Sequence, residues 1–316
     1  MSRAGVPVFT AQDVERAVSP EHAVEAVRDA FLAHFRGEWT MPPKVYVTNY
    51  PAGDFRAMPA LGGGHALLKW VTSFPGNPAR GLPTVSGVVL VSNAETGQLE
   101  AVLNAASVTA LRTGAAAVLA AETLGRASAA RGAVIGAGVN GRAAARTFLA
   151  RGRQVAIWDL DAERARRVAE ELGADVAASL EDALSADLVV TVTPGHEVVL
   201  RDGSLRPGQH VSLMGADGPG KAEAAVAELA RAHVFCDDWA QASHGGELAH
   251  AVEEGVLARA DVTELGAVLA GDSRGRESDQ EITVFDSTGL AIQDLAIAVA
   301  ALERIGDLPE LAHIEI

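Results

Sequence analysis

The sequence has a single cysteine, no long apolar run and no histidine spacing typical of a metal site. One thiol cannot form an intrachain disulfide, and its apolar neighbours Val234 and Phe235 predict that Cys236 is buried rather than nucleophilic. A membrane span needs about 18 consecutive apolar residues, and the acidic Asp13 and Glu15 come before a signal peptide could form. We therefore expect a soluble cytoplasmic protein that binds neither a metal ion nor a membrane.

Basic residues are scarce as well. Lysine and arginine together number 26 against 41 acidic residues, which gives a formal net charge of -15. Nucleic-acid affinity rests mainly on basic side chains that neutralise phosphates, so no nucleic-acid partner is expected. Hydrophobic residues make up 48% of the 316 residues, which allows a substantial core. This length exceeds the usual size of one domain and favours two, or one inserted into another.

From about residue 44 to residue 104 the sequence predicts a mostly antiparallel sheet. Its segments are short, rich in β-branched or aromatic residues and separated by turn residues; they read KVYVTNY, DFRAMPA, ALLKWVTSF, TVSGVVLVS and QLEAVLN. Before them, Ser19 caps a predicted helix that has Pro20 in its first turn. After them, an alanine-rich helix over 105–124 ends at Gly125.

Beyond residue 132 strand and helix patterns alternate, which indicates a doubly wound parallel sheet. The final helix, GLAIQDLAIAVAALERIG, is apolar around much of its circumference, so we expect it to pack back on the first domain. The predicted fold is α/β, with a Rossmann-type domain over 127–289 inserted into a mostly antiparallel α+β domain. Residues 1–126 and 290–316 would form this second domain, which binds substrate and dimerises.

A glycine motif opens the predicted Rossmann domain. Gly136, Gly138 and Gly141 follow an apolar strand and begin a helix, with Val139 and Asn140 between the last two. These glycines permit a tight turn, close approach of the backbone to a pyrophosphate, and close packing of helix on strand. The helix amino terminus then faces the phosphates. The motif therefore predicts a dinucleotide site.

The strand that follows, VAIWD, ends at Asp159, 23 residues after Gly136. An acid at this position hydrogen-bonds the adenosine ribose, and its charge repels the 2′-phosphate of NADP. NAD is therefore the predicted cofactor, although the nearby Arg164, Arg166 and Arg167 would favour NADP.

Only three lysines occur, Lys44, Lys69 and Lys221. Lys69 is flanked by large apolar residues in ALLKWV, where burial would lower its pKa towards a range useful for proton transfer. The alternative is a lysine that faces solvent from a strand.

Two arginines and one aspartate also stand out. Arg56 and Arg112 lie in apolar settings, and a guanidinium can hold a carboxylate bidentately. Asp217 comes just after a predicted parallel strand, where open α/β sheets bind ligands. An ordinary turn aspartate is the alternative.

Together these segments resemble the ornithine cyclodeaminase and mu-crystallin family, and most of all its archaeal-type alanine dehydrogenases. The resemblance runs from about residue 40 to residue 300 and rests on motifs in the same order: MPPKVYV, GDFRAMP, LLKWV, GNPARGLPTV, SVTALRTGAAA, GAGVNG, GADGPGK, DDWAQASHGGE and GRESDQEITVFDSTGLAIQD. It implies that Lys69, Arg112 and either Lys44 or Arg56 surround a substrate carboxylate. Asp217 would be the catalytic carboxylate near the nicotinamide.

The same resemblance implies further cofactor contacts. Thr113 in SVTALRT would lie near the cofactor phosphates, and Ser287 and Gly289 in FDSTG would lie near the nicotinamide. The family fold is a homodimer in which both chain ends contribute to the sheet domain.

Within the family, a residue two positions before the Met-Pro pair, here Arg56, separates the possible substrates. Members that cyclise ornithine carry an acid there, whereas Arg56 would repel a diamino acid. The implied reaction is reversible oxidative deamination of L-alanine to the 2-oxo acid pyruvate and ammonia, with Lys69 or Asp217 moving protons. The alternatives are an ornithine cyclodeaminase, a ketimine reductase, or a non-catalytic dinucleotide-dependent binding protein. The retained Lys69, Arg112 and Asp217 argue against the last.

Overall fold

The computed structural model describes residues 5–195, 197–218 and 220–316. They form two compact units: unit 1 contains the chain up to Arg112 together with Leu290–Ile316, and unit 2 is Thr113–Gly289. The chain passes from unit 1 to unit 2 within the helix α3 (Ala105–Leu124), whereas the boundary predicted from the sequence follows the end of that helix. The chain returns to unit 1 after Gly289.

Unit 1 is built on one seven-stranded sheet in the order β15-β1-β6-β5-β4-β3-β2. Its strands are β1 (Val6–Phe9), β2 (Val45–Asn49), β3 (Gly53–Gly62), β4 (His65–Ser73), β5 (Val85–Asn93), β6 (Leu99–Asn104) and β15 (Ala312–Ile314). All neighbours pair antiparallel except β1 and β6, which are parallel. The mostly antiparallel sheet is confirmed. The sequence analysis missed β1 and β15, which are too short to show an alternating pattern.

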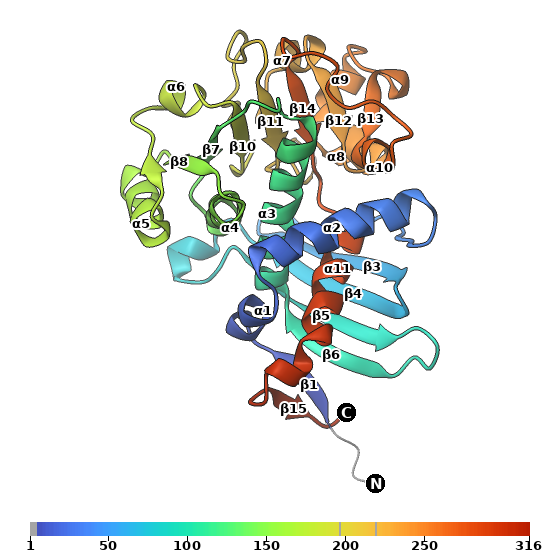
Figure 1. Cartoon of the computed structure of the whole chain (residues 1–316). Helices are drawn as coiled ribbons and strands as arrows, with labels where there is room; N and C mark the ends of the chain where they lie inside the picture. The colour runs from blue at the N-terminus through green and yellow to red at the C-terminus, as the bar shows by residue number, and fades with distance from the viewer. Residues whose placement is uncertain (1–4, 196, 219) are drawn as a thin grey trace. The chain divides into compact units, whose positions relative to one another are not determined.

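Three helices lie wholly within unit 1: α1 (Ala11–Ala17), α2 (Pro20–Phe35) and α11 (Ala291–Glu303). The Ser19 side chain accepts a hydrogen bond from the His22 N–H, 3.2 Å away, which confirms the predicted cap of α2. Helix α11 packs against α2 and on β3 and β4 (Figure 1). Its burial on most sides explains its nearly continuous apolar sequence.

The two faces of this sheet differ along β4. Lys69 is buried on one face, whereas its neighbours Leu68 and Trp70 are each 39% exposed on the other. Trp70 stands in register with Ala57 of β3, which pairs in turn with Val45 of β2, 56% exposed. The sheet therefore presents large apolar side chains to solvent on one face.

Unit 2 contains an eight-stranded parallel sheet in the order β13-β12-β14-β11-β10-β7-β8-β9. Its strands are β7 (Arg131–Ile135), β8 (Gln154–Trp158), β9 (Asp175–Val176), β10 (Leu188–Thr191), β11 (His210–Leu213), β12 (His233–Cys236), β13 (Val262–Glu264) and β14 (Thr283–Asp286). Its helices besides α3 are α4 (Val139–Ala150), α5 (Ala162–Leu172), α6 (Leu180–Ala183), α7 (Val226–Ala230), α8 (Trp239–Gly245), α9 (Leu248–Glu253) and α10 (Leu265–Ala270). The doubly wound α/β fold is confirmed, and the strand order reverses at β7.

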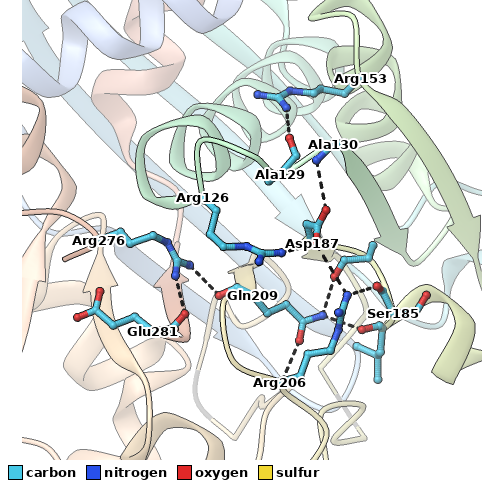
Figure 2. A network of polar contacts seen from close by, with 12 residues as sticks. Arg126, Ala129, Ala130, Arg153, Ser185, Asp187, Arg206, Gln209, Arg276 and Glu281 are labelled. Carbon is cyan, nitrogen blue, oxygen red and sulfur yellow. Dashed lines mark hydrogen bonds and ion pairs between the residues drawn. The ribbon is translucent and has the colours of Figure 1, made fainter. Parts of the chain in front are cut away.

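A polar network joins the chain segments that enter the parallel strands (Figure 2). Asp187, directly before β10, accepts hydrogen bonds from the Arg126 guanidinium at 2.7 Å and from the Ala130 N–H at 3.2 Å. Arg276 donates to the carbonyl oxygen of Gln209, directly before β11, at 2.9 Å. The donors and acceptors of this network thus pair with one another at the amino ends of the strands. Open α/β sheets bind ligands at the opposite edge, beyond the carboxyl ends of the strands.

Cys236 is fully buried at the end of β12, and burial raises the pKa of its thiol. The prediction of a buried cysteine is confirmed. Within the described ranges, no helix is long and apolar enough to cross a membrane. The same ranges contain no group of three His, Cys, Asp or Glu side chains placed to hold a metal ion.

Candidate active site

The turn between β7 and α4 has the geometry that a dinucleotide requires. Gly136 has a φ of 106°, a conformation that favours glycine, and a side chain at Gly141 would overlap the Gly136 carbonyl oxygen. A Cβ at Gly138 would meet no atom within 4 Å, and the adjacent Val139 is 68% exposed. The first N–H groups of α4, including that of Asn140, have no acceptor within the helix. This open turn therefore fits a pyrophosphate.

Asp159 follows β8 and is held against that turn. Its carboxylate accepts hydrogen bonds from the N–H of Ala137 at 2.7 Å and from the N–H of Asp161 at 2.8 Å. Its side chain is only 11% exposed, and the half-exposed Arg164 guanidinium lies 3.6 Å away. The acid is thus fixed beside the glycine turn, and the half-exposed Arg164 offsets part of its charge.

The other predicted cofactor residues lie in α3 and after β14. Thr113 is 2% exposed, and its hydroxyl has no hydrogen-bond partner in the described part of the chain. Ser287 Oγ and the Gly289 N–H both donate to Asp237 Oδ2, at 3.0 and 2.9 Å. Asp237 therefore shapes the turn that carries both residues. The sequence analysis missed it, although it directly follows the strand β12.

A second buried acid organises the carboxyl ends of β10 and β11. Glu223 is fully buried and accepts hydrogen bonds from Thr191 Oγ1, the Thr193 N–H and the Gly215 N–H, each 2.7 Å long. Burial raises the pKa of Glu223, and these hydrogen bonds oppose the rise. Because Gly215 lies two residues before Asp217, Glu223 fixes the start of the loop that carries the predicted catalytic aspartate.

Asp217 itself forms an ion pair with the third lysine of the chain. Lys221 Nζ donates to Asp217 Oδ1 at 2.5 Å, and the Asp217 side chain is 36% exposed. The sequence analysis proposed Asp217 without this partner, although a four-residue spacing of opposite charges was visible. The pair gives Asp217 a fixed orientation while leaving it accessible.

In unit 1 the structure brings Lys69 and Arg112 together at one carboxylate. Lys69 Nζ lies 2.8 Å from Asp294 Oδ1, and Arg112 Nε lies 3.5 Å from the same oxygen. Lys69 is 1% exposed and Asp294 is fully buried, which excludes the alternative of a solvent-facing lysine. Burial lowers the pKa of Lys69 to about 8, the Asp294 carboxylate opposes this shift, and the Arg112 and Arg56 guanidinium groups add to it.

Arg56 is also buried, but it has a partner that the sequence analysis missed. Its Nε donates to Asp54 Oδ1 at 2.6 Å and its Nη2 to Asp54 Oδ2 at 3.3 Å. Its guanidinium lies over the Tyr46 ring, 5.3 Å from the centroid. Lys44 is half-buried directly before β2. Asp54 therefore balances the charge of Arg56, whereas Lys69 and Arg112 share one carboxylate.

The charges of this buried set decide what it can bind. Its members are Arg56, Lys69, Arg112, Asp54 and Asp294, so three cations face two carboxylates and one positive charge is left over. An uncompensated buried charge is costly, and one carboxylate on a ligand would neutralise it.

A parallel sheet with a dinucleotide-binding turn, joined to a unit with a buried cationic cluster, defines the class of two-domain, dinucleotide-dependent oxidoreductases. More particularly, the chain belongs to the ornithine cyclodeaminase/mu-crystallin family, whose model matches residues 6–307. This confirms the resemblance seen in the sequence.

Individual relatives cover almost the whole chain. The alanine dehydrogenase of Archaeoglobus fulgidus is 42% identical over 94% of this chain and 94% of its own. The structure of an archaeal alanine dehydrogenase dimer with bound NAD superposes with a TM-score of 0.92, at 39% identity, over 98% of this chain and 99% of that one. The NAD+ complex of the iminosuccinate reductase of Paracoccus denitrificans gives 0.90, at 30% identity, over 99% and 100%.

Proposed function

We propose that this protein is an NAD-dependent amino-acid dehydrogenase that oxidises L-alanine to pyruvate and ammonia. The observation that carries the proposal is the buried Lys69, Arg112 and Asp294 cluster, because its charge suits a single carboxylate. Support also comes from the 42% identity with the alanine dehydrogenase of Archaeoglobus fulgidus. A cytoplasmic location goes with the proposal.

The two units have different binding roles in this proposal. We propose that unit 1, together with residues 113–126, binds substrate and that the remainder of unit 2 binds NAD. Bound NAD would supply the hydride acceptor for oxidation at the substrate Cα, and hydrolysis of the resulting imine by water would give pyruvate and ammonia. Arg112 binds the substrate carboxylate with help from Arg56 or Lys44. Holding the substrate in one orientation supplies much of the rate.

Two residues are candidates for proton transfer. The pKa of Lys69, lowered to about 8, leaves a useful neutral fraction in mildly alkaline solution. Asp217 is accessible and oriented by Lys221. Either side chain can take a proton from the water that attacks the imine, so both are assigned to catalysis.

The cofactor assignment follows from Asp159. Its fixed carboxylate beside the glycine turn suits two ribose hydroxyls and disfavours a 2′-phosphate. Gly136, Gly138, Val139, Asn140 and Gly141 would contact the pyrophosphate. Thr113, Ser287 and Gly289 would complete the site.

The first experiment follows NADH absorbance and proline formation with purified protein, NAD and either alanine or ornithine. It then follows NADH absorbance with NADH and either pyruvate plus ammonia or a cyclic imine. Alanine-dependent NADH formation is the expected result. Conversion of ornithine to proline without net NADH would instead indicate a cyclodeaminase. Turnover of a cyclic imine alone would indicate a ketimine reductase. Cofactor binding without conversion of any substrate would favour a binding protein.

A single variant then tests the catalytic assignment. Asp217→Asn should abolish most turnover while NADH binding stays nearly intact, because the change removes a charge without removing volume. Asp202→Asn, at an exposed aspartate of the same unit, is the matched control and should keep normal turnover. Near-normal turnover in Asp217→Asn would remove this residue from the mechanism.

We also propose that the protein is a homodimer, formed through the exposed apolar face of the unit 1 sheet. Val45, Leu68 and Trp70 are 56%, 39% and 39% exposed on this face. Large exposed apolar side chains gathered on one face mark interaction sites. The archaeal alanine dehydrogenase of similar structure is itself a dimer.

A further inference from the structure

Helix α11 carries two adjacent polar residues in an otherwise apolar stretch. Gln293 and Asp294 stand in the segment AIQDLAIAVA, and both are fully buried. Burying a carboxylate is costly unless charged or hydrogen-bonding partners compensate it. The contacts of these two side chains therefore indicate why they are there.

Asp294 uses one of its two oxygens to hold two cations from different elements. Oδ1 accepts a hydrogen bond from Lys69 Nζ of β4 at 2.8 Å and lies 3.5 Å from Arg112 Nε of α3. Oδ2 is buried and has no hydrogen-bond partner within the described residues. Without this carboxylate, two buried cations would face each other uncompensated.

Gln293 contacts the same arginine from the next position of the helix. Its Oε1 accepts hydrogen bonds from the Leu290 N–H at 3.2 Å and from Arg112 Nη1 at 3.5 Å. Its Nε2 is buried and makes no hydrogen bond to any residue that the structure describes, and the same is true of Arg112 Nε. Two buried donors on contacting side chains thus require an acceptor.

Resting on the proposed function, we propose that Gln293 and Asp294 complete the carboxylate-binding site of unit 1. Asp294 is a positioning residue that fixes Lys69 and Arg112. Gln293 binds the substrate carboxylate directly through Nε2, beside the Arg112 guanidinium. A carboxylate supplies the acceptor that Gln293 Nε2 lacks, gives Arg112 a hydrogen-bond partner beyond its 3.5 Å ion pair with Asp294, and neutralises the remaining positive charge of the cluster.

The role of Asp294 is testable without any ligand. Protein labelled with [ε-13C]lysine contains only three labelled side chains, Lys44, Lys69 and Lys221, and Lys69→Arg assigns the signal of Lys69. In the wild type, Lys69 should titrate with a pKa of about 8. The charged groups that face it are Asp294 from α11, Arg112 from α3 and Arg56 from β3.

Asp294→Asn should lower the Lys69 pKa by roughly 1 to 3 units, because one attractive charge is lost and two repulsive ones remain. The Lys221 signal, from unit 2, is the internal control and should not move. An unchanged Lys69 titration overturns the positioning role. Asp294→Glu keeps the charge but displaces it, so the Lys69 pKa should stay near the wild-type value while kcat/KM falls about tenfold or more. If Asp294→Asn does not fold, Asp294→Glu tests the proposal in its place. A kcat/KM of Asp294→Glu equal to that of the wild type overturns the proposal.

Gln293→Glu tests the direct contact. The new side chain keeps an acceptor for the Leu290 N–H and for Arg112 but removes the Nε2 donor and adds a negative charge. The dissociation constant of pyruvate in the presence of NADH should rise about tenfold or more, with NADH binding itself changed less than about twofold. Unchanged pyruvate binding overturns the role of Gln293. If alanine is not oxidised but pyruvate binding still depends on Gln293, the carboxylate site stands and the alanine assignment fails.

Discussion

The substitution Glu223→Gln tests whether the buried acid at the ends of β10 and β11 is ionised. Its two oxygens accept three hydrogen bonds, from Thr191 Oγ1, the Thr193 N–H and the Gly215 N–H, each 2.7 Å long. A glutamine has only one oxygen at this end. In either orientation its NH2 group therefore faces one of the two backbone N–H donors.

The size of the effect follows from these contacts. One buried N–H left without an acceptor costs about 1 to 3 kcal/mol. The two retained bonds change from charged to neutral, which weakens each by about 1 kcal/mol. Removal of the desolvation cost of a buried charge offsets part of this loss. We expect a net destabilisation of about 2 to 4 kcal/mol, and a melting temperature lower by roughly 5 to 15 °C.

Urea unfolding at pH 7 and thermal melting measure this loss directly. Glu171→Gln is the control, because Glu171 is half-exposed and its surface ion pair with Arg142 should contribute less than about 1 kcal/mol. A loss below about 0.5 kcal/mol at Glu223 would refute the reasoning. It would mean that Glu223 is already protonated in the folded protein, where a glutamine is nearly isosteric.

Four further outcomes are expected. Burial raises the pKa of Glu247 from 4.5 to about 8, so the folded protein binds this proton more tightly than the unfolded chain. The free energy of unfolding therefore falls as pH rises from 4.5 to 8, by up to about 1.4 kcal/mol per pH unit. Glu247→Gln should remove this slope, as measured by urea unfolding at several pH values. Burial lowers the pKa of His210 from 6.5 to about 3, so the free energy of unfolding should fall as pH drops from 6.5 to 3. His210→Gln should remove this dependence, which again reaches about 1.4 kcal/mol per pH unit. Asp159→Ser should raise the ratio of NADP to NAD in kcat/KM by about tenfold or more, and an unchanged ratio would show that Asp159 does not select the cofactor. If the proposed homodimer forms through the unit 1 sheet, Trp70→Glu should give monomers in light scattering, whereas the matched Leu160→Glu, at a residue 82% exposed in unit 2, should not.

The features that the sequence predicted well are those set by local physics. Helix α3 spans Ala105–Leu124, as its alanine-rich pattern and the following Gly125 predicted. The glycine turn and Asp159 follow from the steric limits of a β-α turn and the length of one strand-helix-strand unit. Burial of Lys69 was predicted as one of two alternatives, from the large apolar residues on either side of it.

The ionic partners escaped prediction because they depend on three-dimensional packing. Asp294 lies 225 residues from Lys69, so no spacing rule connects them. The usable signal was compositional, since a carboxylate inside an apolar helix requires a buried cation. The pairing of Asp54 with Arg56 could have been predicted from the sequence. The two residues are two positions apart on one strand, and such residues share a face of the sheet.

Buried polar atoms without partners add an independent argument about where the chemistry lies. In the described part of the chain, two such atoms, Arg112 Nε and Thr113 Oγ1, occupy consecutive residues of α3. Three more, on Asp286, Gln293 and Asp294, lie within nine consecutive residues at the end of β14 and the start of α11. Two others, Arg126 Nε and Gln241 Oε1, lie elsewhere in the described residues. Folded proteins satisfy nearly all buried polar groups, so five exceptions out of seven in two short segments require a reason other than stability. Both segments include residues that the sequence motifs assigned to substrate or cofactor, and a bound ligand would supply the missing partners.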